Sequence, residues 1–313
     1  MGSTRQIFPK KNERFLDDET VLWRYVPLKT LFLYLTETIF IPSVEKLRQG
    51  DPFEGEFYFE TTRFNKTLQE RYGHEYEKVL KWLEDQFSPT ELMRIKRQTG
   101  LKYVDDYKAR CREKHYFDFL RKTRYAWCWF ASPTESAAMW NVYGSHGVAI
   151  ASTIGKVRNA LSQAENNFAF GRLRYVTVEN GKTTDLNFKD SEDAQLILEP
   201  HFLKRNEYAS ENEVRFLTTS NEHEHNPGIF IPGIKPAEWI QEIRLWPKLD
   251  SSEASSLKEA IKKFVPEMSC VQSALMSRKP DEPSRILLRA LGLQDDKAWY
   301  NGSDEIPKIL KFP

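Results

Sequence analysis

Short apolar runs and helix-spaced apolar stripes alternate along the first fifty residues. Residues 21–26, Val-Leu-Trp-Arg-Tyr-Val, have strand character, and Pro27 follows where a helix can begin. The apolar residues of 28–35 recur at helical spacing, which predicts that helix. Residues 39–42 predict a second strand, and a polar loop follows over 48–55. The chain is therefore expected to open strand, helix, strand, loop.

The region 64–124 is predicted to be a helical insertion. An apolar stripe at helical spacing runs through its first part, and Ser88-Pro89-Thr90-Glu91 is typical of a helix start. Basic residues outnumber acidic ones between Arg94 and Arg124. This excess has two interpretations, a solvated helix face or a surface for a phosphate-bearing macromolecule.

The rest of the chain predicts an irregular mixture of strands and helices. A strand is expected at 125–130, and Ser132-Pro133-Thr134-Glu135 repeats the helix-start pattern directly after it. Further strands are predicted at 147–153, 173–178, 229–231 and 240–246, and further helices near 156–164, 192–208 and 252–264. This order predicts a single α+β domain over 1–313, with the insertion at 64–124 and a weakly helical tail from about 278.

Composition sets limits on the partners. The formal charge is only +1, so no overall attraction to nucleic acid or to a membrane surface is expected. No apolar run approaches the length of a membrane span, and the N-terminus lacks a secretory apolar core. Cys111, Cys128 and Cys270 lie far apart, without metal-type spacing, as in proteins of a reducing compartment. We expect a cytoplasmic protein with no metal site and no membrane partner.

The strongest sign of chemistry is a pair of glutamates, Glu211 and Glu213, at the entry to an apolar strand. On a strand, side chains two residues apart share a face, so both carboxylates would project into one space. Two neighbouring acids can hold a sugar and stabilise positive charge on its anomeric carbon. The alternative is an edge strand that is kept soluble by charge, with Arg215 pairing one of the acids.

Short motifs in a shared order resemble the bacterial domain-of-unknown-function 2971 family, over roughly residues 21–277. The motifs are Leu22-Trp23-Arg24-Tyr25, Ser43 with Asp51-Pro52-Phe53-Glu54, Met139-Trp140 with Tyr143, Gly147-Val148-Ala149-Ile150, Lys204 with Tyr208, and Glu211-Asn212-Glu213-Val214-Arg215. From the residues alone, the Asp51–Glu54 segment is either a substrate loop, with two acids flanking a fixed turn, or a turn whose proline and phenylalanine pin the chain to the core.

The same order resembles, more distantly, the ADP-ribosyltransferases of the arginine-serine-glutamate type. These have an arginine on the first core strand, a serine-threonine strand in the middle and Glu-x-Glu before a late strand. The matching positions here are Arg24, Ser152 with Thr153, and Glu211-x-Glu213, and Ser132 is an equal candidate for the serine. The resemblance implies an α+β fold with an ADP-ribosyltransferase-like mixed sheet core and a helical insertion.

That resemblance implies roles for these residues. Arg24 would bind the pyrophosphate or a ribose of NAD through its guanidinium fork, unless it is an ordinary strand arginine paired to an acid. Glu213 would accept hydrogen bonds from ribose hydroxyls and stabilise the transition state as nicotinamide departs, and Glu211 would orient or deprotonate the acceptor. Ser152, or Ser132, would fix Glu213 through a hydroxyl; the alternative for either is a cap or a strand-surface serine.

Three tyrosines, Tyr25, Tyr143 and Tyr208, are candidates for stacking on nicotinamide or adenine, although such residues also belong to cores. The assignment requires Arg24 and Glu213 to face one cleft within reach of a single dinucleotide, and Arg24 on the opposite face of the sheet would make the analogy with the ADP-ribosyltransferases empty.

The expected function is transfer of ADP-ribose from NAD, used as a substrate, to a macromolecular acceptor, either protein or nucleic acid. A toxin or phage-defence effector with a neutralising antitoxin partner is the setting that such a fold implies. An NAD glycohydrolase with water as acceptor is a close variant. The rivals are a non-catalytic ligand sensor or interaction module on the same fold, and a nucleic-acid-processing domain that relies on Asp51, Glu54 and the basic helices.

Overall fold

The computed structural model describes residues 2–6, 15–51, 53–55, 121–179, 182–183, 200–220 and 227–275. Most of the expected helical insertion and the tail from about 278 lie outside these ranges, as do Cys111 and the first half of the expected helix at 192–208. The chain divides into two compact units, Met1–Gln272 and Ser273–Pro313. All the elements described below belong to the first unit.

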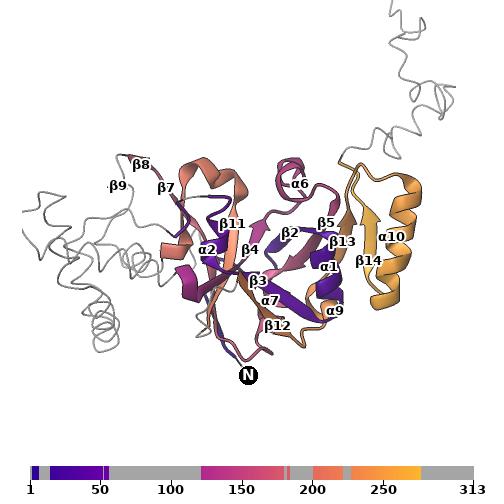
Figure 1. Cartoon of the computed structure of the whole chain (residues 1–313), viewed down its shortest axis with the longest axis horizontal. Coiled ribbons are helices and arrows are strands. Elements are labelled where there is room, and N and C mark those ends of the chain that lie inside the picture. Colours follow the sequence, from indigo (N-terminus) through magenta and orange to yellow (C-terminus); the bar gives the residue numbers. More distant parts are fainter. Residues whose placement is uncertain are drawn as a thin grey trace, which may run out of the picture. The chain divides into compact units, whose positions relative to one another are not determined.

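An eight-stranded mixed sheet organises this unit (Figure 1). Its strands, in spatial order, are β1 (Thr4–Gln6), β6 (Phe168–Arg172), β11 (Glu213–Thr219), β4 (Arg124–Ala131), β2 (Val21–Pro27), β5 (Gly147–Thr153), β13 (Glu242–Leu245) and β14 (Ser269–Gln272). The two outermost pairs are parallel and the pairs between them are antiparallel. The predicted α+β class with a mixed sheet is confirmed.

Shorter elements surround the sheet. The helices are α1 (Leu28–Leu35), α2 (Val44–Leu47), α6 (Ala137–Tyr143), α7 (Ile154–Leu161), α9 (Pro236–Trp239) and α10 (Ser251–Phe264), with 3-10 turns η1 (Pro200–Phe202) and η2 (Asn206–Glu211). Two-stranded pairs join β3 (Thr38–Pro42) to β12 (Gly228–Pro232), β7 (Arg174–Val176) to β10 (Leu203–Arg205), and β8 (Val178–Glu179) to β9 (Lys182–Thr183).

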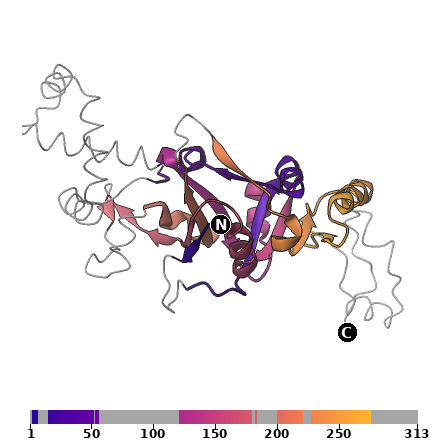
Figure 2. The ribbon, with the colours of Figure 1, turned by 90° about the horizontal axis from the view of Figure 1, so that it is seen from below.

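Local sequence explains where several helices begin. Thr153 ends β5 and caps α7 by accepting a hydrogen bond from the Lys156 amide. Asp250 and Glu253 form a reciprocal capping box at the start of α10, and lysines in its last turn match the helix dipole. In two views related by a 90° turn, α1 (indigo) and α10 (orange) lie near each other (Figures 1 and 2). The rings of Phe32 and Phe264 meet edge to face, with 5.9 Å between their centroids.

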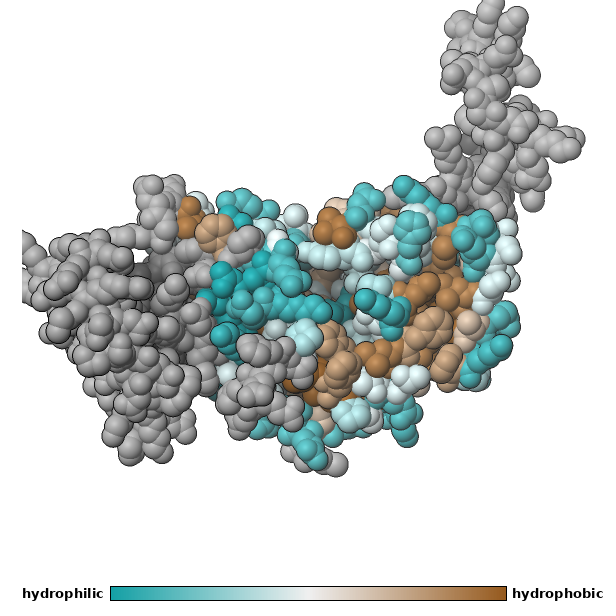
Figure 3. All heavy atoms as spheres, in the orientation of Figure 1, coloured by the Kyte–Doolittle hydropathy of each residue, from teal (hydrophilic) through white to brown (hydrophobic). Residues whose placement is uncertain are grey.

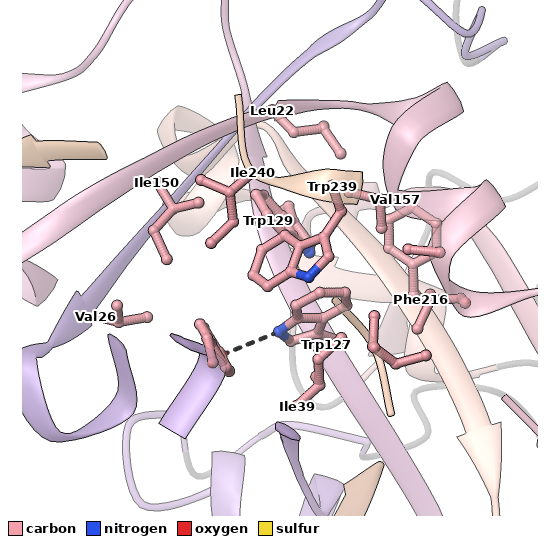
Figure 4. Packing of buried hydrophobic residues seen from close by; sticks show 14 of the residues in the cluster. Leu22, Val26, Ile39, Trp127, Trp129, Ile150, Val157, Phe216, Trp239 and Ile240 are labelled. Carbon is pink, nitrogen blue, oxygen red and sulfur yellow. Dashed lines mark hydrogen bonds between the residues drawn. The ribbon is translucent and has the colours of Figure 1, made fainter. Parts of the chain in front are cut away.

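The main core covers one face of the sheet, which we call the first face. Apolar residues of α1, α7, α9, α10 and the β3–β12 pair pack there against inward-facing residues of the strands. Trp127 lies at its centre, with its ring 5.1 Å from that of Trp129 and 5.2 Å from that of Trp239 (Figure 4). The dashed line in that figure marks the hydrogen bond that Trp127 Nε1 donates to the Tyr34 hydroxyl at 3.3 Å. This packing holds in place the strands from which the side chains of the opposite face project.

The opposite, second face carries two smaller apolar clusters. One joins α6 to β2 and β5 through Trp23, Tyr25 and Trp140. The other joins α2, β7 and β10 to β4 and β11 through residues such as Phe202 and Leu217. Figure 1 draws α6 above the strands and α7 and α9 below them, which matches this division. The two clusters leave space between them over the centre of the sheet.

Two helix predictions are wrong in the described residues. The second half of the expected helix at 192–208 forms η1, β10 and the start of η2 instead. The helix expected to begin at Ser132 begins later, because Ser136 is the residue that caps α6, by accepting from the Met139 amide. Within the described part of the chain, no helix combines the length and the apolar character that crossing a bilayer requires.

We predict that Trp127→Ala lowers the free energy of unfolding by about 3–5 kcal/mol, because it opens a large cavity among packed rings. Urea denaturation at neutral pH measures this change. The control is Val142→Ala, at a side chain that is 64% exposed on α6; its effect should stay within about 0.5 kcal/mol. Equal effects of the two substitutions would contradict the central place given to Trp127.

Candidate functional site

A pocket of about 410 Å³ lies over the centre of the sheet, between the two clusters of the second face. Its walls come from strands β2, β3, β4, β10 and β11, from α1, α2, α6 and η2, and from the loop around Asp51. This volume lies within the range of about 300–1,000 Å³ that is usual for small-molecule sites. In the space-filling view, hydrophilic residues gather left of the centre of the face shown, and hydrophobic residues gather to the right (Figure 3).

A separation of two central strands opens the pocket toward the first face. β2 and β4 pair only at Leu22↔Ala131 and Trp23↔Phe130, and their ladder ends there. Arg24 is the next residue, and its guanidinium fills the gap by donating to the backbone carbonyl of Cys128. The guanidinium of Arg24, in the middle of β2, thus lines the pocket where the hydrogen bonds between β2 and β4 end.

Arg24 and Glu213 enter this pocket from different faces of the sheet. Glu213 lies opposite Phe130 in the β11–β4 register, and so shares the second face with it. Arg24 points to the first face, where its Nε donates to the Tyr34 hydroxyl at 3.2 Å. Both residues nevertheless line the one pocket, because the gap between β2 and β4 connects the two faces. The two residues thus share a pocket, but Arg24 lies on the face of the sheet opposite to Glu213, which is the arrangement that counts against the ADP-ribosyltransferase analogy.

The two glutamates do not lie on one strand as expected. Glu211 ends η2, and Glu213 begins β11. Asn212 between them adopts the left-handed conformation (φ 43°), which asparagine tolerates better than most residues. Its side chain donates to the Ala131 carbonyl and accepts from Arg172, which holds the corner in place. The carboxylates converge because of this corner, not because of strand alternation.

Arg215 anchors the acidic end of the pocket. Its guanidinium donates to both carboxylate oxygens of Glu54, at 2.5 and 2.8 Å, and to Glu213 Oε1 at 2.6 Å. It also donates to the His201 carbonyl at 2.7 Å. The side chains of Arg215, Glu54 and Glu213 are all buried. The expectation that Arg215 pairs an acid of the motif is confirmed, but β11 is an interior strand and the edge-strand interpretation is wrong.

Lys204 extends this chain of alternating charges. Its Nζ lies 2.5 Å from Glu211 Oε2 and 3.1 Å from Glu213 Oε2, and it lies 4.7 Å from the centroid of the Tyr208 ring. Tyr143 closes the chain by donating from its hydroxyl to Glu211 Oε1 at 2.9 Å. The chain therefore runs from the loop at Glu54 to helix α6 across the pocket wall.

These contacts set the protonation states. Burial alone would raise the pKa of Glu213, but the charges of Arg215 and Lys204 outweigh it and lower that pKa to about 2. Burial would lower the pKa of Lys204, but Glu213 and Glu211 hold it above its ordinary value despite the opposing charge of Arg215. Glu213 is thus an anion and Lys204 a cation across the physiological range.

The expected aromatic residues also line the pocket. Tyr25 is held by the Ser136 amide, which donates to its hydroxyl at 2.7 Å, and by an edge-to-face contact with Trp140. Burial raises the pKa of Tyr25 to about 12. Tyr143 is half exposed at the rim, and Tyr208 lies beneath Lys204.

The two candidate serines are not part of this pocket. Ser152 faces the first side of the sheet, is fully buried, and donates to the Trp239 carbonyl. Ser132 follows β4, where its hydroxyl accepts from the Thr134 amide at 3.2 Å and its carbonyl accepts from Trp23. Neither hydroxyl bonds Glu213 in this structure; Arg215 and Lys204 occupy that carboxylate instead.

Glu54 and Lys204 are site residues whose contacts the sequence did not reveal. Both residues belong to the motifs that carry the family resemblance. Glu54, however, lies 161 residues from its partner Arg215, and a local sequence pattern cannot reveal a contact across such a separation. Asp51 accepts from the Phe53 amide at 3.0 Å and pairs with Arg205 at 3.3 Å. Phe53 is 44% exposed and does not pin the chain to the core as the turn interpretation expects, whereas Asp51 and Glu54 both line the pocket.

Potential metal ligands do not gather in groups of three or more within the described ranges, and the absence of a metal stays a prediction. Comparison of the chain with models of protein families, with curated proteins and with solved structures returns no match. The family resemblances drawn from the motifs therefore stay predictions as well.

We predict that Arg215→Met lowers the free energy of unfolding by about 3–5 kcal/mol at neutral pH, because it leaves Glu54 and Glu213 buried without their shared cation. The control is Lys262→Met, which removes an exposed helix pair with Glu259; it should change stability by less than about 1 kcal/mol. Urea titrations of the three proteins measure both effects.

The loss in Arg215→Met should depend on pH. In the native protein the pKa of Glu213 is lowered from 4.5 to about 2, so its stabilisation is present above pH 4.5 and is lost as the pH falls toward 2. In the variant, Glu54 has lost Arg215 and Glu213 keeps only Lys204; acid neutralises these carboxylates and relieves the penalty. The difference between the two proteins should therefore shrink with acidification, and a difference independent of pH would contradict the ion chain.

Proposed function

We propose that the pocket binds NAD and that the protein transfers its ADP-ribose group to a macromolecular acceptor. The observation that carries the proposal is one pocket with a carboxylate pair, Glu211 and Glu213, at one end and a guanidinium, Arg24, elsewhere on its wall. The described hydrogen bonds of Arg24 go to a hydroxyl and a carbonyl, and none goes to a carboxylate. Its positive charge is therefore available to an anionic ligand.

The charges of the pocket match those of the dinucleotide. At the acidic end, Glu54, Glu211 and Glu213 contribute three negative charges and Arg215 and Lys204 two positive ones, which leaves one negative charge in excess there. The rest of the lining adds Asp51, Arg24 and Lys46, so the pocket as a whole has four charges of each sign. NAD carries a positive nicotinamide ring at one end and a pyrophosphate in the middle. The acidic end suits the ring and its ribose, and a rigid guanidinium suits the pyrophosphate.

A second cation lies near the same wall. Lys46 lines the pocket from α2, where its ammonium lies 5.3 Å from the centroid of the Phe40 ring. Its described contacts do not include an ion pair with a carboxylate. Lys46 would add a second positive charge for phosphate oxygens, and Tyr25 and Tyr143 offer aromatic surface for a base.

In the proposed reaction the bond between the anomeric carbon of the ribose and the nicotinamide nitrogen breaks. Its electron pair leaves with nicotinamide, and positive charge develops on the ribose. The fixed charge of Glu213 would stabilise that transition state, and its carboxylate would hold a ribose hydroxyl. The acceptor nucleophile then bonds to the anomeric carbon and gives its proton to Glu211, which Tyr143 orients.

The proposal extends to the fold and the setting. An ADP-ribosyltransferase-like core is supported by the mixed sheet, with an arginine on a central strand and the glutamate pair at the entry to another. We propose a cytoplasmic toxin or phage-defence effector, with a protein or nucleic-acid acceptor and a neutralising antitoxin. The basic segment proposed for acceptor binding lies outside the described residues, except for its last four.

One observation favours a second candidate, a ligand sensor on the same fold without chemistry. Both oxygens of Glu213 already contact cations, and neither candidate serine reaches it. A site that is fully satisfied without a ligand is also what a binding module would have. The two candidates agree on NAD binding and differ on turnover.

The test follows nicotinamide release and ADP-ribose incorporation from labelled NAD, with and without candidate proteins and nucleic acids. Glu213→Gln should lower turnover by about 10²–10³-fold, the usual effect of removing a fixed group that stabilises transition-state charge. Glu259→Gln, at an exposed position of α10, is the matched control and should leave turnover unchanged. Binding without turnover would select the sensor, and turnover without an acceptor would select the glycohydrolase. A native protein that neither binds nor consumes NAD would refute the proposal.

A further inference from the structure

The two cations that hold Glu213 differ in how firmly each is itself held. Arg215 is 1% exposed and retains both oxygens of Glu54 and the His201 carbonyl if its contact with Glu213 is lost. It also lies on β11, which is hydrogen-bonded to a neighbouring strand on each side. Arg215 is therefore a fixed part of the wall.

Lys204 is held much less firmly. It lies on the three-residue strand β10, whose described pairing is to β7 alone. Its ammonium is a single charged group on a flexible four-carbon stem, and its charged contacts are Glu211 and Glu213. A rotation of that stem can release Glu213 while the ammonium stays with Glu211, which is the nearer of the two at 2.5 Å. The positive charge would then remain compensated during the movement.

The position of the ammonium decides which oxygen of Glu213 a ligand can reach. Arg215 Nε occupies Oε1 at 2.6 Å, whereas Lys204 is the near cation at Oε2, at 3.1 Å, with Arg215 Nη2 at 3.3 Å. A hydroxyl that enters from the pocket and bonds Oε2 of Glu213 has to compete with Lys204 for that oxygen. Glu211 and Tyr208 contact the same ammonium, and both line the pocket together with Tyr143, which donates to Glu211.

We propose that Lys204 is a displaceable counter-ion that closes Glu213 to the pocket, and that a bound ligand moves it onto Glu211. Lys204 is thus a positioning residue that regulates the site, and its role toward NAD rests on the proposed function. The closure itself does not, because it is a property of the protein without ligand. A ligand pays for this displacement, so removal of the lysine charge should favour binding.

The first experiment needs no ligand. The protein is treated with a carbodiimide and an amine in mildly acidic buffer, and modification of individual glutamates is followed by mass spectrometry. Carbodiimides react with protonated carboxyl groups, and an opposite charge within hydrogen-bond distance lowers the protonated fraction strongly. Lys204→Met should speed the labelling of Glu213 by about tenfold or more, whereas Lys204→Arg should keep it as slow as in the native protein.

Glu54 provides the internal control for folding. It is as buried as Glu213 and is held by Arg215, and its described contacts do not include Lys204. Its labelling should not change in Lys204→Met, nor in Lys204→Gln, the second variant without charge. Lys262→Met, on the exposed face of α10, should change neither glutamate. Unchanged labelling of Glu213 in both uncharged variants, or an equal rise at Glu54, would overturn the proposal.

The second experiment uses nicotinamide riboside, which carries the ribose hydroxyls and the charged ring without the phosphates. Because this ligand has no phosphate, loss of the lysine charge cannot weaken its binding by removing an attraction to phosphate. Calorimetric titration should give a Kd about tenfold lower for Lys204→Met than for the native protein. A higher or unchanged Kd would overturn the proposal. If nicotinamide riboside and NAD bind to none of the proteins, the proposed function fails, and the labelling experiment alone decides whether Lys204 closes Glu213.

Discussion

The buried guanidinium of Arg215 is the interaction on which the site depends. It joins Glu54, from a loop near the start of the chain, to Glu213 at the entry of β11, and it adds the carbonyl of His201. Charges this deeply buried are tolerated only when they are paired and hydrogen-bonded. The loop with Glu54, the turn η1 with His201 and the strand β11 with Glu213 therefore have to pack around Arg215 at the same time. The acidic end of the pocket wall therefore follows from the need to pair and hydrogen-bond the buried guanidinium of Arg215.

The sheet adds the second constraint. The core around Trp127 holds β4 against the first face, while β2 leaves β4 after two paired positions. Arg24 occupies the resulting gap and replaces lost sheet hydrogen bonds with a bond to the Cys128 carbonyl. The early end of the β2–β4 pairing thus places the charge of Arg24 on the pocket wall. Through this gap, Arg24 and Glu213 line one pocket from opposite faces of the sheet.

The sequence patterns predicted those strands and helices whose formation depends on residues close together in the chain. The apolar runs at 21–26 and 147–153 became β2 and β5, and the stripe of 252–264 became α10. The helix expected after Ser132 begins at Ala137, because Ser136, four residues further on, is the serine that caps it. Glu135 bonds Trp140 and Arg244 instead of completing a cap at Ser132. The glutamate pair converged as expected, but through the left-handed Asn212, and the bond between Glu54 and Arg215 spans too much sequence for any local pattern to report.

The central claim is that Arg24 and Glu213 bind one dinucleotide within this pocket. A crystal structure of the protein with a non-hydrolysable NAD analogue tests it most directly. The account predicts a ribose hydroxyl within hydrogen-bond distance of Glu213 Oε2, the pyrophosphate against Arg24, and the Lys204 ammonium withdrawn to Glu211. An analogue bound elsewhere on the protein, or bound in the pocket with its phosphates away from Arg24, would contradict it.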